Sequence, residues 1–159
     1  IAVRLAPVLR SLGAQVTGVA TKAGVRDGFA VIATHEVPAA LPNTDVLISL
    51  LPDVPATRGA LNADVFAALP RRAVVVNVGR GAVLDEAALD AALRDDVIAG
   101  AALDVFDTEP LPAASPLWST PRLVISPHAA GGRPIGAGSL IAHNVAALLA
   151  GQPLRNVAR

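Results

Sequence analysis

The chain contains 159 residues, of which 53% are hydrophobic, so it can form one domain with a sizeable core. Gly, Pro and charged residues interrupt its apolar runs, and no stretch approaches the roughly 18 apolar residues of a membrane span. Thirteen basic and thirteen acidic side chains give a formal net charge of zero, and no basic stripe is visible, which argues against a nucleic-acid surface.

The first residues of the chain and the absence of cysteine and methionine allow predictions about where the protein is located and whether the sequence is complete. Arg4 and Arg10 interrupt the first apolar stretch and no small-residue cleavage pattern follows, so we expect no signal peptide and a cytoplasmic protein. Cysteine is absent, which excludes a disulfide framework and a thiolate metal site, and we predict no metal site. Methionine is also absent and the chain opens within a helical pattern, so we expect a piece of a longer polypeptide.

The first third of the chain predicts a helix followed by short strands. Apolar residues share one helical face over Ala2–Leu12, and Gly13 is a typical residue to follow a helix end. We then expect a strand, a polar turn, a second short strand and a helical turn, respectively over Ala14–Ala20, Thr21–Gly24, Ala30–Ile32 and Glu36–Leu41.

Four short apolar strands alternate with helices in the rest of the chain. The strands are predicted over Asp45–Leu51, Val74–Val78, Val97–Val105 and Arg122–Ser126. Asn62 is predicted to cap a helix that ends at Leu69, Asp85 to cap the helix Glu86–Arg94, and a long helix is predicted over Ile135–Leu149. This alternation predicts an α/β fold with a doubly wound parallel sheet.

Three successive strands lead to a polar residue of a catalytic type: Arg80, Glu109 and His128. Because the carboxyl ends of parallel strands share one edge of a sheet, where ligands bind, these residues are expected to converge. Arginine offers a planar fork for a carboxylate, histidine a proton near neutral pH, and glutamate a charge that orients the histidine and favours its protonated form. Together they suit a small carboxylate-bearing substrate and a proton-coupled step.

Three segments resemble the cofactor-domain signatures of the D-isomer-specific 2-hydroxyacid dehydrogenases: Asn77–Gly81, Ala102–Pro112 and Ser126–Gly132. Leu51-Pro52 with Thr57-Arg58-Gly59 is similar to the family's segment after its fourth strand, and the segments occur in the family's order and spacing. The resemblance implies a Rossmann-type dinucleotide-binding domain over residues 1–132. Residues 133–159 would form a C-terminal helix and tail that return toward a substrate domain.

The resemblance also implies the role of each site residue. Arg80 would bind the substrate carboxylate and polarise its carbonyl, and His128 would protonate the carbonyl oxygen as hydride arrives from the nicotinamide. Glu109 would hydrogen-bond His128 and keep it protonated. Asp104 would hold the nicotinamide end. The full set of implied cofactor contacts is Ile1, Ala2, Thr21, Lys22, Leu51, Pro52, Thr57, Val78, Gly79, Arg80, Asp104, His128, Ala130 and Gly131.

The chain departs from the family at its glycine fingerprint, G-x-G-x-x-G. Ile1 and Ala2 match only the last two positions, and the first two glycines and the strand before them are missing. In the strand order 3-2-1-4-5-6 the missing first strand is central. We therefore expect the Ala14–Ala20 and Asp45–Leu51 strands to lack a direct partner toward the Val74–Val78 side. Because each buried unpaired backbone group costs about 1–3 kcal/mol, this chain is expected to fold poorly alone and to be inactive.

The residues after the Ala14–Ala20 strand bear on the choice of cofactor. NAD enzymes of this type carry an acid there, which binds the ribose 2′-hydroxyl. Here Ala20 is followed by Thr21 and Lys22, so no carboxylate would repel a 2′-phosphate and both side chains could hold one. The cofactor is predicted to be NAD or NADP, with NADP favoured, and a polar turn without this role is the alternative.

The main hypothesis is an NAD(P)-dependent reductase that interconverts a small 2-keto acid and its D-2-hydroxy acid, with glyoxylate and hydroxypyruvate as expected substrates. A dinucleotide-sensing protein, similar to corepressors on this fold, is one alternative. A dinucleotide domain such as that of an adenosylhomocysteine hydrolase or an alanine dehydrogenase is another, and the order Arg80, Glu109, His128 argues against it. Trp118 either packs under the last strand or contacts substrate. The resemblance implies a homodimer.

Overall fold

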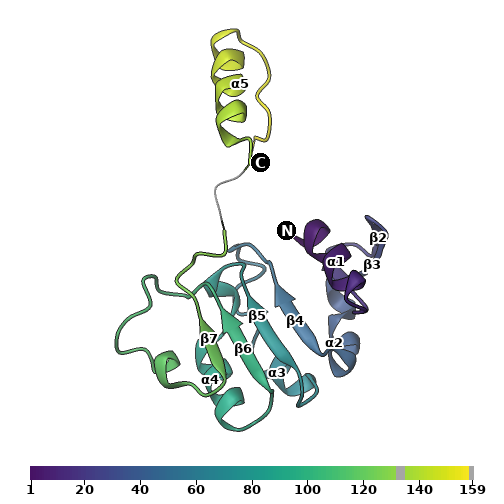
Figure 1. Ribbon diagram of the computed structural model, residues 1–159, viewed down its shortest axis with the longest axis vertical. Coiled ribbons are helices and arrows are strands. Elements are labelled where there is room, and N and C mark those ends of the chain that lie inside the picture. The colour runs from purple at the N-terminus through teal and green to yellow at the C-terminus, as the bar shows by residue number, and fades with distance from the viewer. Residues whose placement is uncertain (132–134, 158–159) are drawn as a thin grey trace. The chain divides into compact units, whose positions relative to one another are not determined.

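The computed structural model describes residues 1–131 and 135–157 (Figure 1). They belong to two compact units, Ile1–His128 and Ala129–Arg159. The domain boundary predicted at residues 132 and 133 lies outside the described residues. The second unit contains helix α5 (Ala137–Leu149), which starts slightly later than the predicted helix, after Gly136 with its left-handed φ of 81°.

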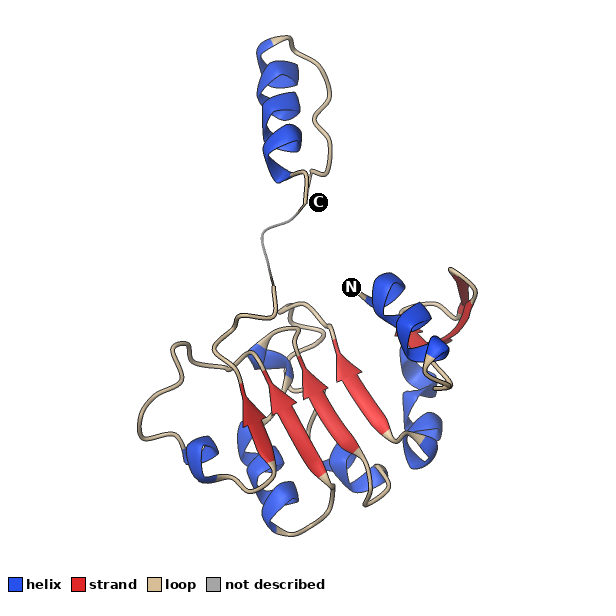
Figure 2. Ribbon diagram, in the orientation of Figure 1, coloured by secondary structure: helices blue, strands red, loops and turns tan. Residues whose placement is uncertain are grey.

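A four-stranded parallel sheet forms the larger part of the first unit (Figure 2). The register pairs Ser49 with Asn77, Asn77 with Leu103, and Leu103 with Ile125, so the four strands end at one edge. This sheet confirms the predicted α/β fold. Its strands, in hydrogen-bonded order, are β4 (Val46–Ser49), β5 (Val74–Asn77), β6 (Gly100–Leu103) and β7 (Leu123–Ile125).

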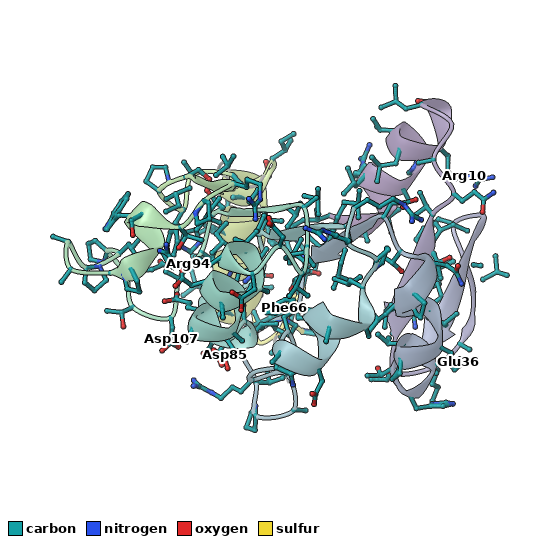
Figure 3. All side chains as sticks on the ribbon, turned by 90° about the horizontal axis from the view of Figure 1, so that it is seen from below. Arg10, Glu36, Phe66, Asp85, Arg94 and Asp107 are labelled. Atoms are coloured by element: carbon teal, nitrogen blue, oxygen red, sulfur yellow. The ribbon has the colours of Figure 1, made fainter. Side chains whose placement is uncertain are left out.

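Helices α3 (Ala63–Ala68) and α4 (Glu86–Arg94) pack on this sheet and enclose the main hydrophobic core (Figure 3). As predicted, the side chains of Asn62 and Asp85 cap them, each accepting a backbone N–H, at 3.2 and 2.9 Å. Burying a large apolar side chain stabilises a fold by roughly 1.5–3 kcal/mol, so this core is a main source of stability. Its most deeply buried members include Phe66, Val75, Leu89, Leu93 and Leu103.

A smaller sheet, in the order β1-β3-β2, precedes the larger one in sequence. Strand β2 runs antiparallel to β3 and was not predicted; it begins at Gly24, so the predicted polar turn Thr21–Gly24 is one residue too long. Asp27 and Gly28 connect the two strands with φ values of 48° and 80°, the two-residue hairpin that an Asp-Gly pair favours. The elements here are α1 (Ala2–Ser11), β1 (Thr17–Ala20), β2 (Gly24–Arg26), β3 (Phe29–Ala33) and α2 (Val37–Ala40).

The two sheets are separate, as expected of a Rossmann-type sheet without its first strand. Among the described residues, β1 and β2 each pair only with β3, and β4 pairs only with β5. No strand of the smaller sheet is hydrogen-bonded to a strand of the larger one in this part of the chain. The prediction that the Asp45–Leu51 strand lacks a partner toward the Val74–Val78 side is wrong, because β4 and β5 are directly hydrogen-bonded from Val46 to Ser49. The unpaired side of β4 is the opposite one, since each strand has only two sides for pairing.

Short 3₁₀ turns complete the connections: η1 (Thr34–Glu36), η2 (Leu41–Asn43), η3 (Gly81–Val83) and η4 (Pro116–Ser119). In the part of the chain that the structure describes, every helix is too short or too polar to traverse a lipid bilayer.

Candidate active site

The turn after strand β5 presents Arg80. The strand's last residue, Asn77, closes this turn from inside: its Oδ1 accepts the N–H of Gly79 at 3.1 Å, and its Nδ2 donates to the carbonyl oxygen of Arg80 at 3.0 Å. Asn77 is completely buried, whereas the Arg80 side chain is exposed. The exposed guanidinium of Arg80 therefore lies at the edge of the sheet, on a turn whose backbone is held by the buried side-chain amide of Asn77.

Neighbouring loops hold the same turn from both sides. A Cβ on Gly79 would come within 2.6 Å of the carbonyl oxygen of Leu51, in the loop after β4. A Cβ on Gly81 would overlap the backbone of Phe106, in the loop after β6. Both positions therefore require glycine, and the two glycines beside Arg80 let its backbone pack closely against adjacent strands' loops.

Glu109 and His128 are hydrogen-bonded to each other at the same edge of the sheet. His128 Nδ1 lies 2.7 Å from Glu109 Oε2, and the other carboxylate oxygen accepts the N–H of Phe106 at 3.0 Å. The pKa of Glu109 is lowered by the hydrogen bond to His128 first, then by the Phe106 N–H and the charges of His128 and Arg80. The charge of Arg80 is the smallest of these causes, and it places Arg80 at the same edge of the sheet, close enough to act on Glu109.

His128 follows strand β7 and adopts a left-handed φ of 52°, a conformation that is uncommon for a residue with a Cβ. Two residues before it, the hydroxyl of Ser126 donates to Asp104 Oδ1 at 2.5 Å. Asp104 follows β6 and is 4% exposed, and its N–H donates to the carbonyl oxygen of Asn77 at 3.0 Å. Asp104 thus links the ends of three neighbouring strands, β5, β6 and β7.

Two cavities lie along this edge. The larger, of about 660 Å³, has mostly apolar walls with Glu109 and His128 among them. Trp118 also lines it, 56% exposed, with its indole N–H donating to the carbonyl oxygen of Pro112 at 2.9 Å. The remaining walls are Phe106, Pro110, Leu111, Ile125 and Pro127. Trp118 therefore lies in the wall of a cavity that reaches the Glu109–His128 pair.

The smaller cavity, of about 220 Å³, lies at the ends of β4 and β5. It brings together six of the residues that the family resemblance implies as cofactor contacts: Ile1, Leu51, Pro52, Val78, Gly79 and Arg80, with Leu50 beside them. Thr57 braces the loop that supplies this wall, because its hydroxyl donates to the carbonyl oxygen of Pro52 at 2.5 Å.

Other predicted cofactor residues lie elsewhere. Thr21 and Lys22 follow β1 in the smaller sheet, are exposed, and line neither cavity. Ala2 is the first residue of α1. Ala130 and Gly131 belong to the second compact unit, and Gly132, at the end of the predicted Ser126–Gly132 motif, lies outside the described residues. Their cofactor roles stay predictions.

Sequence reasoning overlooked two polar residues that shape this edge, Asn77 and Ser126. A signal was present for both, because each is a polar residue at the end of an otherwise apolar strand. What the sequence could not show is that Asn77 bonds to the turn that carries Arg80, and Ser126 to Asp104.

A comparison with known protein families shows which family the chain belongs to. The family described as D-isomer specific 2-hydroxyacid dehydrogenase, NAD binding domain, matches residues 1–130. The chain belongs to this family. The resemblance carried by Asn77–Gly81, Ala102–Pro112 and Ser126–Gly132 is thereby confirmed.

Relatives within the 2-hydroxyacid dehydrogenase family include glyoxylate/hydroxypyruvate reductase A of Serratia proteamaculans, 48% identical over 128 residues, which are 79% of this chain and 41% of that protein. The reductase A of Yersinia enterocolitica is 46% identical over 105 residues, 65% of this chain and 34% of that protein. The chain thus spans less than half the length of these relatives.

Solved structures of the family share the fold. The NADPH-dependent glyoxylate/hydroxypyruvate reductase of Sinorhizobium meliloti, in complex with NADP and sulfate, superposes with a TM-score of 0.88 at 35% identity, over 98% of this chain and 51% of that one. A family member from Xanthobacter autotrophicus Py2, in complex with NADPH and MES, gives a TM-score of 0.84 at 40% identity, over 92% and 62% of the two chains. The Rossmann-type prediction is confirmed.

Proposed function

We propose that the whole protein is an NAD(P)-dependent reductase of small 2-keto acids, with glyoxylate or hydroxypyruvate as substrate and the D-2-hydroxy acid as product. The observation that carries the proposal is the Glu109–His128 hydrogen bond of 2.7 Å, with the charge of Arg80 acting on Glu109 at the carboxyl edge of a parallel sheet. An acid–base group beside a cation is what the reduction of a carbonyl next to a carboxylate requires.

The residues around the smaller cavity fit a dinucleotide. Its walls at the ends of β4 and β5 are mostly apolar residues and Gly79, with Arg80 beside them. Open α/β sheets bind dinucleotides at this edge. Leu51, Pro52, Val78 and Gly79 would hold the nicotinamide end, and the buried carboxylate of Asp104 would accept from its carboxamide.

When bound, the nicotinamide supplies a hydride to the carbonyl carbon of the substrate. Arg80 would bind the substrate carboxylate through its planar guanidinium, which fixes the carbonyl in one orientation. His128 would give a proton to the carbonyl oxygen, so that the carbonyl gains one hydride and one proton and becomes a hydroxyl. Glu109, held by the Phe106 N–H, would orient His128 and stabilise its protonated form.

We propose NADP(H) as the preferred cofactor. Thr21 and Lys22 follow β1, and residues 14–24 contain no carboxylate that would repel a 2′-phosphate. The two solved relatives from Sinorhizobium meliloti and Xanthobacter autotrophicus hold NADP and NADPH, which supports the same preference. A KM for NADH well below that for NADPH would contradict it.

We also propose that the whole protein is a homodimer, as the family resemblance implies. Light scattering coupled to gel filtration measures the mass directly, and a monomer mass at micromolar concentration would contradict this proposal.

The test of the reaction is the oxidation of NADPH and of NADH by the whole protein, with glyoxylate and hydroxypyruvate, monitored at the nicotinamide absorbance. Turnover that collapses in Arg80→Ala is the expected result. Arg58→Ala is the matched control, because Arg58 is an exposed arginine paired with Asp53 at 3.1 Å in the loop after β4. Tight dinucleotide binding without turnover of either acid would contradict the proposal and favour a dinucleotide sensor.

A further inference from the structure

We infer that Asn77 is a positioning residue that sets the direction of Arg80 toward the substrate carboxylate. The inference rests on the proposed function. Asn77 touches no solvent and lines neither cavity, so it would act only through the turn that it closes.

Both ends of the Asn77 amide bind the backbone of that turn. Oδ1 accepts the N–H of Gly79 at 3.1 Å and Nδ2 donates to the carbonyl oxygen of Arg80 at 3.0 Å. The two bonds bracket the peptide between Gly79 and Arg80. Burying an amide group costs free energy unless the group is hydrogen-bonded. Any other path of the turn would break one of these two bonds and leave a buried polar group without a partner, so such a path is disfavoured.

The backbone of Asn77 is fixed as well. It pairs with Ser49 on one side and Leu103 on the other, and its carbonyl oxygen accepts the N–H of Asp104 at 3.0 Å. The backbone of Asn77 is therefore held on both sides by neighbouring strands, and its side chain holds the turn through two hydrogen bonds.

The amide does what the neighbouring glycines cannot. Gly79 and Gly81 allow the turn to pack closely against the Leu51 and Phe106 backbones, but they have no side chain that could hydrogen-bond the peptide groups of the turn. The exposed Arg80 side chain departs from a backbone with φ −141° and ψ 145°, and its Nη1 donates to the carbonyl oxygen of Gly79 at 2.6 Å. Rotation of the Gly79–Arg80 peptide would therefore redirect the Cα–Cβ bond of Arg80 and also move the Gly79 carbonyl oxygen that its guanidinium binds.

The consequence should be largest for the acid substrate. A displacement of about 1 Å in a binding group can cost on the order of 100-fold in rate, because orientation is lost. Loss of the Asn77 amide should therefore weaken binding of the keto-acid carboxylate most. Because Gly79 and Arg80 also line the smaller cavity, dinucleotide binding should weaken too, but less, since Ile1, Leu51 and Pro52 line that cavity outside the turn. Arg80 would remain present but poorly aimed.

The experiment compares Asn77→Ala with Val75→Ala in the whole protein. Val75 lies on the same strand, is also completely buried, and packs in the main core rather than against the turn, so it matches the loss of packing. For Asn77→Ala we expect the KM for glyoxylate to rise at least about 10-fold, by the same loss of orientation, and the KM for NADPH, whose cavity shares Gly79 and Arg80, to rise by a smaller factor. Asn77→Gln, which keeps the amide on a longer stem, should not restore the substrate KM.

A merely structural role predicts a different result, in which both variants lower the melting temperature and neither changes the KM for glyoxylate. That result would overturn the inference while wild-type turnover upheld the proposed function. No wild-type turnover would overturn the proposed function itself.

A second measurement needs no variant. In the ¹⁵N-labelled wild-type protein with NADP, addition of oxamate, a carboxylate analogue of the substrate, should shift the side-chain amide signal of Asn77 and the backbone amide of Gly79. An unchanged Asn77 amide at saturating oxamate would overturn the inference even where Asn77→Ala does not fold.

Discussion

The two sheets of the first unit differ in how they are buried. The larger sheet, β4 to β7, packs against α3 and α4 over a core that includes Phe66, Leu89 and Leu93. The buried cluster on the smaller sheet contains Ala6, Phe29 and Val31, with Ala33 also buried on β3, and every residue of β2 is exposed. All three residues proposed for the chemistry follow strands of the larger sheet, whereas Thr21 and Lys22 follow a strand of the smaller one. The proposed chemistry would therefore lie on the sheet with the larger buried core, and the proposed 2′-phosphate contacts on the sheet with the smaller one.

The largest effect is expected at His128, which the division assigns to the reaction. His128→Ala should lower kcat for glyoxylate reduction by about 10²–10⁴-fold, the usual contribution of a general acid. NADPH binding, measured by its fluorescence, should change little. His143→Ala is the control, because His143 lies on the exposed part of helix α5. Equal losses in both variants would contradict the role of His128.

The two buried phenylalanines test the difference in packing directly. Phe66, 1% exposed in the larger core, should cost about 3–5 kcal/mol of unfolding free energy when replaced by Ala. Phe29, 7% exposed in the smaller core, should cost less, because few buried neighbours surround it. Denaturant unfolding of the two variants gives the comparison. An equal or larger loss for Phe29→Ala would show that the smaller sheet is as tightly packed as the larger one.

A smaller effect is expected at Lys22. Lys22→Ala should raise the KM for NADPH by several-fold, on the order of the 1 kcal/mol of an exposed charge pair, and leave the KM for NADH and kcat unchanged. Arg26→Ala, a cation on β2, is the control. A KM for NADPH that does not respond would remove the smaller sheet from cofactor choice.

The smallest effect concerns the stability that Glu109 contributes. Its pKa is lowered in the folded protein, first by the hydrogen bond to His128, so the ionised carboxylate stabilises the fold above its ordinary pKa of about 4.3 and this contribution is lost as the pH falls through the lower folded value. Glu109→Gln should therefore melt below the wild type near neutral pH, and the difference should vanish in acid. The Glu109 side chain is 36% exposed, so solvent screens its interactions and the expected effect on stability is small. A difference that grows toward low pH would reverse the sign and contradict the pairing.

The same division explains what the sequence could predict. The buried strands β4 to β7 and the caps Asn62 and Asp85 follow from local patterns, because apolar runs and capping residues act over short distances. The convergence of Arg80, Glu109 and His128 was predicted from the shared edge of parallel strands, and the structure brings their charges together.

The smaller sheet was harder to predict because its strands carry little buried surface. Strand β2 is exposed throughout, so its hydrophobic pattern is weak, and only the Asp27-Gly28 pair marked the hairpin. The pairing of β4 with β5 was assigned wrongly, since pairing depends on contacts between distant residues that no local pattern encodes. The hydrogen bonds from the Asn77 side chain to the turn that carries Arg80 could not be predicted either, because they depend on the three-dimensional path of the turn.

The most direct test of the proposed reaction follows the transferred atom. The whole protein is incubated with NADPH deuterated at the transferable position of the nicotinamide and with hydroxypyruvate, and the product is analysed by NMR and chiral chromatography. Transfer of deuterium to carbon 2 of D-glycerate, abolished in His128→Ala, is the predicted result. A product of the L hand, or hydroxypyruvate that remains unreduced while the dinucleotide binds, would contradict it.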